Sequence, residues 1–185
     1  MEHLCAERVI SFGSVEPKYN NETTNGGYSN NYVVAQNFAV KIPGNAQMEK
    51  VAPLMCAGIN AYSPVLFSKV KKGDKVGVAG FGGIGHMAVK YAVALGAEVT
   101  VFDITEDKRQ DALRLGAVKY VNVRRPAELQ GLNNSLNVII NIIPSGHDPL
   151  VYLKMIRLGG EMAVLGLPPT AAPPRSLPRR CRTCH

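Results

Sequence analysis

Short apolar runs and stretches with helical periodicity alternate along the middle of the chain. Residues 76–79 form an apolar run directly after a turn signal at 72–74, which predicts a strand. Beyond a loop with four glycines, apolar residues recur at helical spacing over 84–95, and Gly96 suits a C-terminal cap. A second strand is predicted over 97–103. This order of elements is typical of α/β proteins with a parallel sheet.

The alternation of helices and strands continues to residue 167. Gly116 suits the end of one helix, and Asp148 and Pro149 suit the N-cap and first turn of another. About five strands are expected in all, so the predicted fold class is α/β, with a Rossmann-type doubly wound parallel sheet. A ligand crevice is expected at the carboxyl ends of the strands. The further predicted elements are helices over 106–117 and 148–160 and strands over 118–123, 136–143 and 161–167.

Both ends of the chain differ from this middle. Residues 27–43 hold two short β-branched and aromatic runs separated by polar residues, which predicts a fragment of an all-β domain. Residues 169–185 are rich in proline and arginine and lack apolar periodicity, so they cannot pack a core. We therefore expect an all-β fragment over 1–45, the α/β domain over 46–167 and a disordered tail over 168–185.

Composition and charge disfavour several classes of protein. Of the 185 residues 46% are hydrophobic, yet no apolar run approaches the roughly 20 residues that cross a bilayer. The start of the chain lacks a secretory signal, so a cytoplasmic location is expected. The net charge of +7 is concentrated in the tail, so the rest of the chain is nearly balanced and predicts neither nucleic-acid nor membrane binding. The arginines of the tail are Arg175, Arg179, Arg180 and Arg182.

The glycine loop has the spacing of a phosphate-binding turn. Gly80 would permit the tight turn, Gly82 would let the backbone approach a pyrophosphate, and Gly85 would let the helix pack on the strand. The N–H groups and the dipole at the helix start would attract the phosphates. A glycine triplet alone can mark any tight turn from strand to helix, so the prediction depends on the ordered elements around it.

Asp103 ends the second predicted strand, 18 residues beyond Gly85. Dinucleotide folds place the acid that binds the ribose hydroxyls at roughly 20 residues. Its negative charge would oppose a 2′-phosphate and favours NAD over NADP. Thr105, Lys108 and Arg109 lie close enough to keep NADP possible.

Five motifs along the chain resemble one family of enzymes. They are GGYSNNYVV, APLMCAGINAYSP, GFGGIGHMAVKYA, ALRLGA and VLGLP, spread over residues from about 2 to 168. In this order they resemble the zinc-dependent medium-chain alcohol dehydrogenases, and in particular the cinnamyl alcohol dehydrogenase branch. The resemblance implies a GroES-like β-barrel domain, of which 1–45 would be a remnant, beside a Rossmann domain. It also implies catalysis between the two domains, in which zinc polarises a small-molecule alcohol or aldehyde and hydride passes between it and the nicotinamide.

The resemblance adds residues to the expected cofactor site. Gly83 and Ile84 belong to the glycine motif, and Gly166 belongs to VLGLP. His86 follows the family pattern in the loop and is expected in the cofactor crevice. The complete predicted set is Gly80, Gly82, Gly83, Ile84, Gly85, Asp103, Thr105, Lys108 and Gly166.

Two cysteines match zinc ligands of the family. Cys56 corresponds to the third protein ligand of the catalytic zinc, and Cys5 to the last of four cysteines of the structural zinc. The companion ligands would precede Met1, so zinc binding by this chain is in doubt, and Cys56 could instead be a buried small hydrophobe. Asn60 stands where the family has threonine. No acid or base can be named, because the family's proton-relay groups belong to the barrel.

The tail and the remaining histidines give weaker signals. Cys181, Cys184 and His185 match the C-x-x-C-H pattern of haem attachment. The alternatives are zinc capture by the same residues and a disordered basic tail, and we prefer the disordered tail to either form of binding. His3 and His147 show no partner and are expected on the solvated surface. The family pairs subunits through a sixth strand that the tail composition does not supply, so a homodimer is doubtful.

Two functions therefore stay open. The chain is expected to act, alone or completed by another polypeptide, as an NAD(P)-linked oxidoreductase on primary alcohols or aldehydes. The alternative is a dinucleotide-binding module without hydride transfer, and the missing zinc ligands favour that behaviour for the isolated chain.

Overall fold

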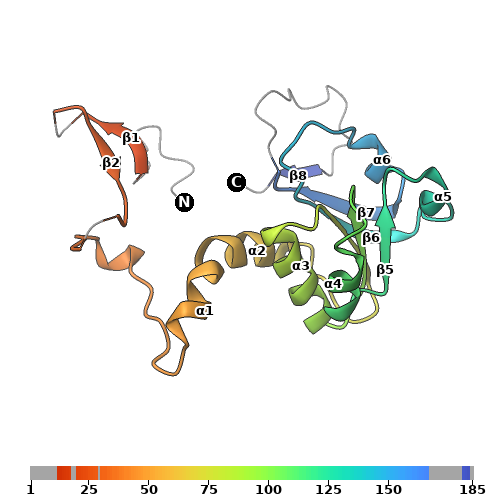
Figure 1. The fold of residues 1–185 in the computed structure, drawn as a ribbon, viewed down its shortest axis with the longest axis horizontal. Coiled ribbons are helices and arrows are strands. Elements are labelled where there is room, and N and C mark those ends of the chain that lie inside the picture. Colours follow the sequence, from red (N-terminus) through yellow and green to blue (C-terminus); the bar gives the residue numbers. More distant parts are fainter. Residues whose placement is uncertain (1–11, 18–19, 29, 167–180, 184–185) are drawn as a thin grey trace. The chain divides into compact units, whose positions relative to one another are not determined.

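A computed structural model describes residues 12–17, 20–28, 30–166 and 181–183 (Figure 1). The chain divides into two compact units, Met1–Ala46 and Gln47–His185. Within the described residues, no helix combines the length and the apolarity that crossing a membrane requires. Cys5, His3 and most of the predicted tail lie outside the described residues.

The first unit contains one β-hairpin. Strands β1 (Phe12–Glu16) and β2 (Glu22–Asn25) pair antiparallel, joined by a turn in which Asn20 and Asn21 have φ of 51° and 58°. Asparagine tolerates this left-handed conformation better than most residues, which explains the position of the turn. Residues 27–43, interpreted from the sequence as a fragment of an all-β domain, form no strand among the described residues. They hold a short 3₁₀ helix, Gln36–Phe38, and most of their apolar side chains are exposed.

The second unit is built on a six-stranded parallel sheet. Its spatial order is β5-β4-β3-β6-β7-β8, so the chain winds outward from β3 in one direction and then returns to β6 on the other side. Val76 of β3 pairs with Val99 of β4 and with Val138 of β6. The strands are β3 (Lys75–Ala79), β4 (Glu98–Asp103), β5 (Lys119–Asn122), β6 (Leu136–Asn141), β7 (Ile156–Val164) and β8 (Cys181–Thr183).

This sheet buries a core on each face, which confirms the predicted doubly wound α/β fold. Because side chains alternate along a strand, Val76 and Val78 face one cluster while Ala79 faces the other. The first cluster packs against α2 (Ile59–Phe67), α3 (Gly83–Ala94) and α4 (Arg109–Arg114). The second lies beside α5 (Pro126–Leu129) and α6 (Leu150–Leu153), with Phe102, Ile139 and Tyr152 at its centre. The crevice at the switch between β3 and β6 is therefore flanked by well-packed strands.

Two boundaries differ from the prediction. The helix expected over 148–160 ends as α6 at Leu153, and Ile156–Val164 is strand instead. Gly159, with φ of 82°, cannot continue a right-handed helix at that conformation. At Gly160 a Cβ would lie 2.6 Å from the carbonyl oxygen of Asn137 on β6. Close pairing with β6 therefore decides the conformation of this stretch.

Residues 48–67 are helical throughout. They form α1 (Met48–Pro53), a π-helix η3 (Leu54–Gly58) and α2, and Pro64 lies inside α2. Tyr62 of α2 packs edge-on against Tyr91 of α3, with ring centroids 5.3 Å apart. These helices leave several apolar side chains exposed: Met48, Leu54, Met55, Ile59, Leu66 and Phe67.

The tail contributes a strand that the sequence did not predict. β8 pairs parallel with β7, with Met162 opposite Cys181 and Val164 opposite Thr183. The expectation of a tail without regular structure is wrong for these three residues. Backbone pairing to an open sheet edge does not require apolar side chains, and this explains why composition gave no sign of it. Cys184 and His185 lie outside the described residues, so the C-x-x-C-H pattern stays untested.

Candidate functional site

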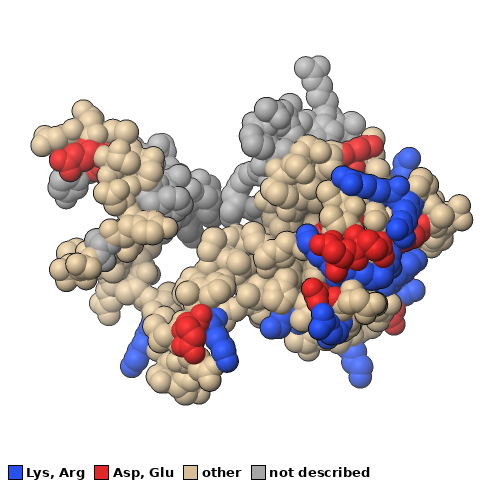
Figure 2. All heavy atoms as spheres, viewed as in Figure 1, with Lys and Arg blue, Asp and Glu red and all other residues tan. Residues whose placement is uncertain are grey.

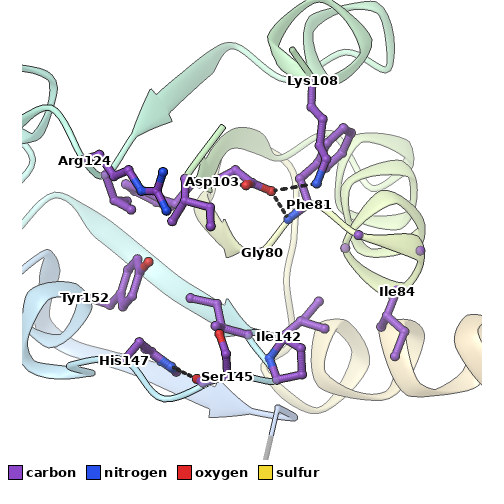
Figure 3. Close-up of a pocket in the computed structure, with 18 of the residues that line it drawn as sticks. Gly80, Phe81, Ile84, Asp103, Lys108, Arg124, Ile142, Ser145, His147 and Tyr152 are labelled. Atoms are coloured by element: carbon purple, nitrogen blue, oxygen red, sulfur yellow. Dashed lines mark hydrogen bonds and ion pairs between the residues drawn. The ribbon is translucent and has the colours of Figure 1, made fainter. Parts of the chain in front are cut away.

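A cavity of about 660 Å³ opens at the carboxyl ends of β3, β4 and β6 (Figure 3). This is the end of a doubly wound sheet at which ligands bind. The glycine loop forms one wall, and the loop after β6 forms the opposite wall. The lining residues are 80–85, 102–104, Lys108, Val123, Arg124, 142–147 and Tyr152.

The glycine wall is set by close backbone packing. Gly80 has φ of 93°, and a Cβ on Gly85 would lie 2.0 Å from the carbonyl oxygen of Gly80. A side chain at Gly85 would have to move the backbone, and at Gly80 the positive φ strains any residue other than glycine. At Gly82 and Gly83, by contrast, an added Cβ would meet nothing within 4 Å. Gly82 and Gly83 therefore border open space beside the first turn of α3. This arrangement suits a phosphate, because the first N–H groups of a helix have no partner within it.

Asp103 lies at the end of β4 and reaches across to the glycine loop (Figure 3). Its Oδ2 accepts a hydrogen bond from the N–H of Phe81 at 2.9 Å and lies 3.5 Å from the Nζ of Lys108. Its Oδ1 accepts from the N–H groups of Ile104 at 2.6 Å and Thr105 at 3.3 Å. The side chain is only 8% exposed. Asp103 thus ties the loop to the sheet, a role that the spacing in the sequence did not reveal.

The other predicted cofactor residues are only partly brought together. Gly80, Gly82, Gly83, Ile84, Gly85, Asp103 and Lys108 line the cavity, whereas Thr105 does not. Thr105 instead accepts a hydrogen bond at its carbonyl from the hydroxyl of Tyr120 at 2.7 Å. Gly166 is not among the lining residues, but its N–H donates to Asn141 at 3.3 Å, and a Cβ there would lie 2.0 Å from the oxygen of Ile143. It packs behind the second wall.

Basic residues near the cavity have different surroundings. Arg109 points away from it, donating to the carbonyl of Tyr120 at 2.7 Å and to Glu128 at 2.9 Å. Hydrogen bonds with Glu106 and Glu128 raise the pKa of Arg109 further. Arg124, which the sequence reasoning missed, lines the cavity on the side of β5. Figure 2 shows basic and acidic side chains interspersed on the face of the α/β unit that is in view.

The second wall is held by side chains. Asn141 ends β6 fully buried, and its Oδ1 accepts a hydrogen bond from the N–H of Ile143 at 3.2 Å. Its Nδ2 lies 2.8 Å from Nε2 of His147, whose Nδ1 lies 2.9 Å from the carbonyl oxygen of Ser145. The expectation that His147 is a solvated residue without a partner is wrong. No local pattern could have shown this, because its partner is the end of a buried strand.

Aromatic rings connect this wall to Asp103. The ring of His147 packs edge-on against Tyr152 at 6.0 Å, and Tyr152 packs edge-on against Phe102 at 5.7 Å between centroids. Burial, with a smaller contribution from the charge of Asp103, raises the pKa of Tyr152 to about 12. Tyr152 therefore stays neutral at physiological pH. His86 lies elsewhere, in a separate hollow with Phe81 and Arg114 rather than in the cavity.

Cys56 lies in the π-helix η3 and is exposed, so its interpretation as a buried hydrophobe is wrong. Asn60 donates from Nδ2 to the carbonyl of Cys56 at 3.0 Å and approaches its Sγ at 3.6 Å. Among the residues that the structure describes, no three side chains of the metal-binding types gather into a site. The described residues thus do not fit a zinc ion, and the assignment of Cys56 rests on the resemblance alone.

Comparison with known proteins extends this picture. The family model of zinc-binding dehydrogenases matches residues 83–181. A protein of Mesembryanthemum crystallinum named a probable mannitol dehydrogenase is 39% identical over 170 residues, which cover 91% of this chain and 46% of that protein. The chain thus spans about half the length of the relative it matches.

Solved structures show the same fold and the same partial coverage. The structure titled CAD from Helicobacter pylori complexed with NADP(H) has a TM-score of 0.80 and 49% identity, covering 90% of this chain and 47% of that one. A cinnamyl alcohol dehydrogenase from Sorghum bicolor has a TM-score of 0.85 and 35% identity, covering 97% and 52%.

Proposed function

Because this chain belongs to the zinc-binding dehydrogenase family, we propose that its cavity binds NAD or NADP and that the protein is an oxidoreductase of the alcohol dehydrogenase type. The observation that carries this proposal is the geometry of the glycine loop. Gly85 packs against Gly80, while open space lies at Gly82 and Gly83 beside the first turn of α3. The complex of the H. pylori relative with NADP(H) supports the same ligand class.

Each wall would hold a different part of the dinucleotide. The pyrophosphate would lie over Gly82 and Gly83, where backbone N–H groups and the helix dipole favour negative charge. Asp103 would accept hydrogen bonds from the ribose hydroxyls through Oδ2, which keeps the N–H of Phe81 at 2.9 Å while the half-exposed Lys108, now at 3.5 Å, moves aside. The loop over 142–147 would cover the ligand from the side of β6. The described residues are thus assigned to the binding of the dinucleotide, and no step of hydride transfer is assigned to them.

Hydride transfer would depend on groups beyond those described. The bound nicotinamide supplies a hydride acceptor or donor for a primary alcohol or aldehyde. Since the described residues do not fit zinc, we assign no metal-dependent step to them. A dinucleotide-binding module without hydride transfer remains the second candidate, because the match covers about half of each relative's chain.

The preference between the two cofactors depends on the charge around Asp103. Its carboxylate would oppose a 2′-phosphate, which favours NAD. Two features reduce the repulsion between this carboxylate and a 2′-phosphate. Backbone N–H groups already donate hydrogen bonds to the carboxylate, and two cationic side chains, Lys108 and Arg124, line the same cavity. We therefore propose a preference for NAD that is modest, on the order of tenfold.

Calorimetric titration of the full chain with NADH and with NADPH tests the proposal. We expect saturable binding of both, tighter for NADH, and a reversal of that order in Asp103→Ser. Asp111→Ser is the matched control, because Asp111 is an exposed carboxylate paired only with Arg114 on the surface of α4. Absence of binding for both nucleotides in a folded chain would contradict the proposal. Consumption of NADH with an aldehyde and zinc would support the oxidoreductase, and binding without turnover would support the module.

A further inference from the structure

We propose that His147 is a positioning residue that holds the second wall of the cavity only while its imidazole is neutral, so that dinucleotide affinity falls when His147 gains a proton. This inference rests on the proposed function for its effect on binding, although the underlying contacts can be tested without any nucleotide. The observations that carry it are the contacts of His147 with Asn141 and Ser145.

The partners of His147 define one tautomer. The carbonyl oxygen of Ser145 can only accept, so Nδ1 of His147 must carry a hydrogen and donate it. Oδ1 of Asn141 is already used to accept the N–H of Ile143, so Nδ2 faces the imidazole and donates to Nε2. The ring is therefore the neutral form with hydrogen on Nδ1. Both ring nitrogens then have a hydrogen-bond partner.

A proton on Nε2 breaks this arrangement whichever way the amide of Asn141 is turned. In the present orientation, Nε2–H would face the amide hydrogens of Asn141 at the 2.8 Å separation. If the amide turned, Oδ1 would accept from His147, but Nδ2 would then face the N–H of Ile143. Asn141 is fully buried, so an N–H left without an acceptor there is costly. We infer that protonation displaces His147 from Asn141 instead.

The displacement would reach the cavity directly. Residues 142–147 form its second wall, and Ser145, Ile142 and His147 border the same space (Figure 3). His147 also supports Tyr152, which packs against Phe102 beside Asp103. Losing the contact with Asn141 would free the part of the loop around His147, while the N–H of Ile143 stays bound to Oδ1 of Asn141. The expected result is a less ordered wall and weaker binding, not unfolding, because the core strands keep their pairing.

Other charged groups around His147 do not replace its contacts. Asp148 follows it in the sequence, and its Oδ1 accepts the N–H of Leu150 at 2.9 Å. Asp103, at the end of β4, faces Tyr152, and Lys108 and Arg124 line the same cavity from α4's N-terminal side and from the end of β5. Tyr152 on α6 stays neutral in the range in which histidine titrates. Protonation of Nε2 of His147 is therefore the change to test.

Nitrogen-15 NMR of the histidine side chains in the full chain tests the contacts without nucleotide. At pH 8 we expect His147 as the Nδ1–H tautomer, and on acidification we expect the backbone amides of Ile143 and Ser145 to shift with the same midpoint as its ring. An Nε2–H tautomer at pH 8, or amides that do not follow the ring, would overturn the proposal whether or not nucleotide binds.

Affinity for NAD⁺ at pH 8 and pH 5.5 supplies the second readout. We expect a loss of about tenfold on acidification, the size of one lost hydrogen bond. His147→Gln keeps a donor and an acceptor without titrating, so its affinity should hardly change with pH, whereas His147→Leu should bind weakly at both. Equal pH dependence in the wild type and in His147→Gln would overturn the inference. Failure of NAD⁺ to bind at any pH would instead contradict the proposed function and leave the NMR result to decide on the contacts.

Discussion

The two walls of the cavity are held in place by different kinds of contact. In the glycine wall, backbone packs on backbone, so closely that Gly85 has no room for a Cβ beside Gly80. In the wall after β6, the loop is held by hydrogen bonds between the side chains of Asn141 and His147 and the loop backbone. The glycine wall also has one side-chain contact, from the N–H of Phe81 to the carboxylate of Asp103, but the packing of Gly85 on Gly80 changes only when an atom is added or removed. A wall made by side-chain hydrogen bonds changes with protonation, so it can alter binding while the fold persists.

The largest expected effect comes from adding one carbon to the glycine wall. Gly85→Ala would place its Cβ 2.0 Å from the oxygen of Gly80, so β3 and α3 would have to separate. Overpacking of this kind typically costs about 1–3 kcal/mol, and a clash with backbone should reach the upper end. Urea denaturation followed by circular dichroism measures the change. Gly83→Ala is the control, since nothing lies within 4 Å of its Cβ, and equal destabilisation of the two would show that the packing of Gly85 on Gly80 does not hold the glycine wall.

A smaller effect, on binding alone, is expected where the glycine wall is open. Gly82→Ala adds a Cβ that meets no protein atom within 4 Å, and its φ of −95° suits alanine. The new methyl would instead occupy space that the pyrophosphate approaches, so we expect about tenfold weaker NADH binding with little change in stability. Calorimetry and thermal unfolding measure the two quantities. Unchanged affinity would mean that the phosphates do not lie over Gly82.

The smallest expected effect lies outside both walls, at the end of β5. The N–H of Asn122 and the side chain of Arg109 lower the pKa of Glu128, which accepts both at 2.9 Å. Because the folded pKa lies below the unfolded one, Glu128 stabilises the fold above the unfolded pKa and loses that contribution as pH falls through the folded pKa.

Glu128→Gln should therefore lower stability at neutral pH, and the difference from the wild type should shrink below about pH 4.5. Urea denaturation at pH 7 and pH 4 measures it, with the exposed Glu49→Gln as the control. A difference that stays constant with pH would show that the ion pair with Arg109 is not what Glu128 contributes. Neither variant should alter NADH affinity, since neither residue lines the cavity.

The sequence predicted those parts of the site whose residues lie close together along the chain. The strand, the glycine loop, α3 and Asp103 could be placed because each rests on residues a few positions apart, with periodicity and turn chemistry in agreement. Arg124 and His147 could not be placed, because neither belongs to a pattern. The β-branched and aromatic runs within 27–43 form no strand among the described residues, because such runs form strands only where a partner strand is available.

By itself, the sequence determined the order of the parallel strands and helices, the glycine turn and the family of this protein. Those properties follow from local conformational preferences and from motifs that read continuously along the chain. Only the tertiary structure decided that β7 begins at Ile156, that Arg109 turns away from the cavity, and that Asn141 meets His147. These three features depend on which polar groups still need a hydrogen-bond partner once the strands have packed. A buried polar group without a partner costs free energy, so the fold settles on the arrangement that pairs such groups.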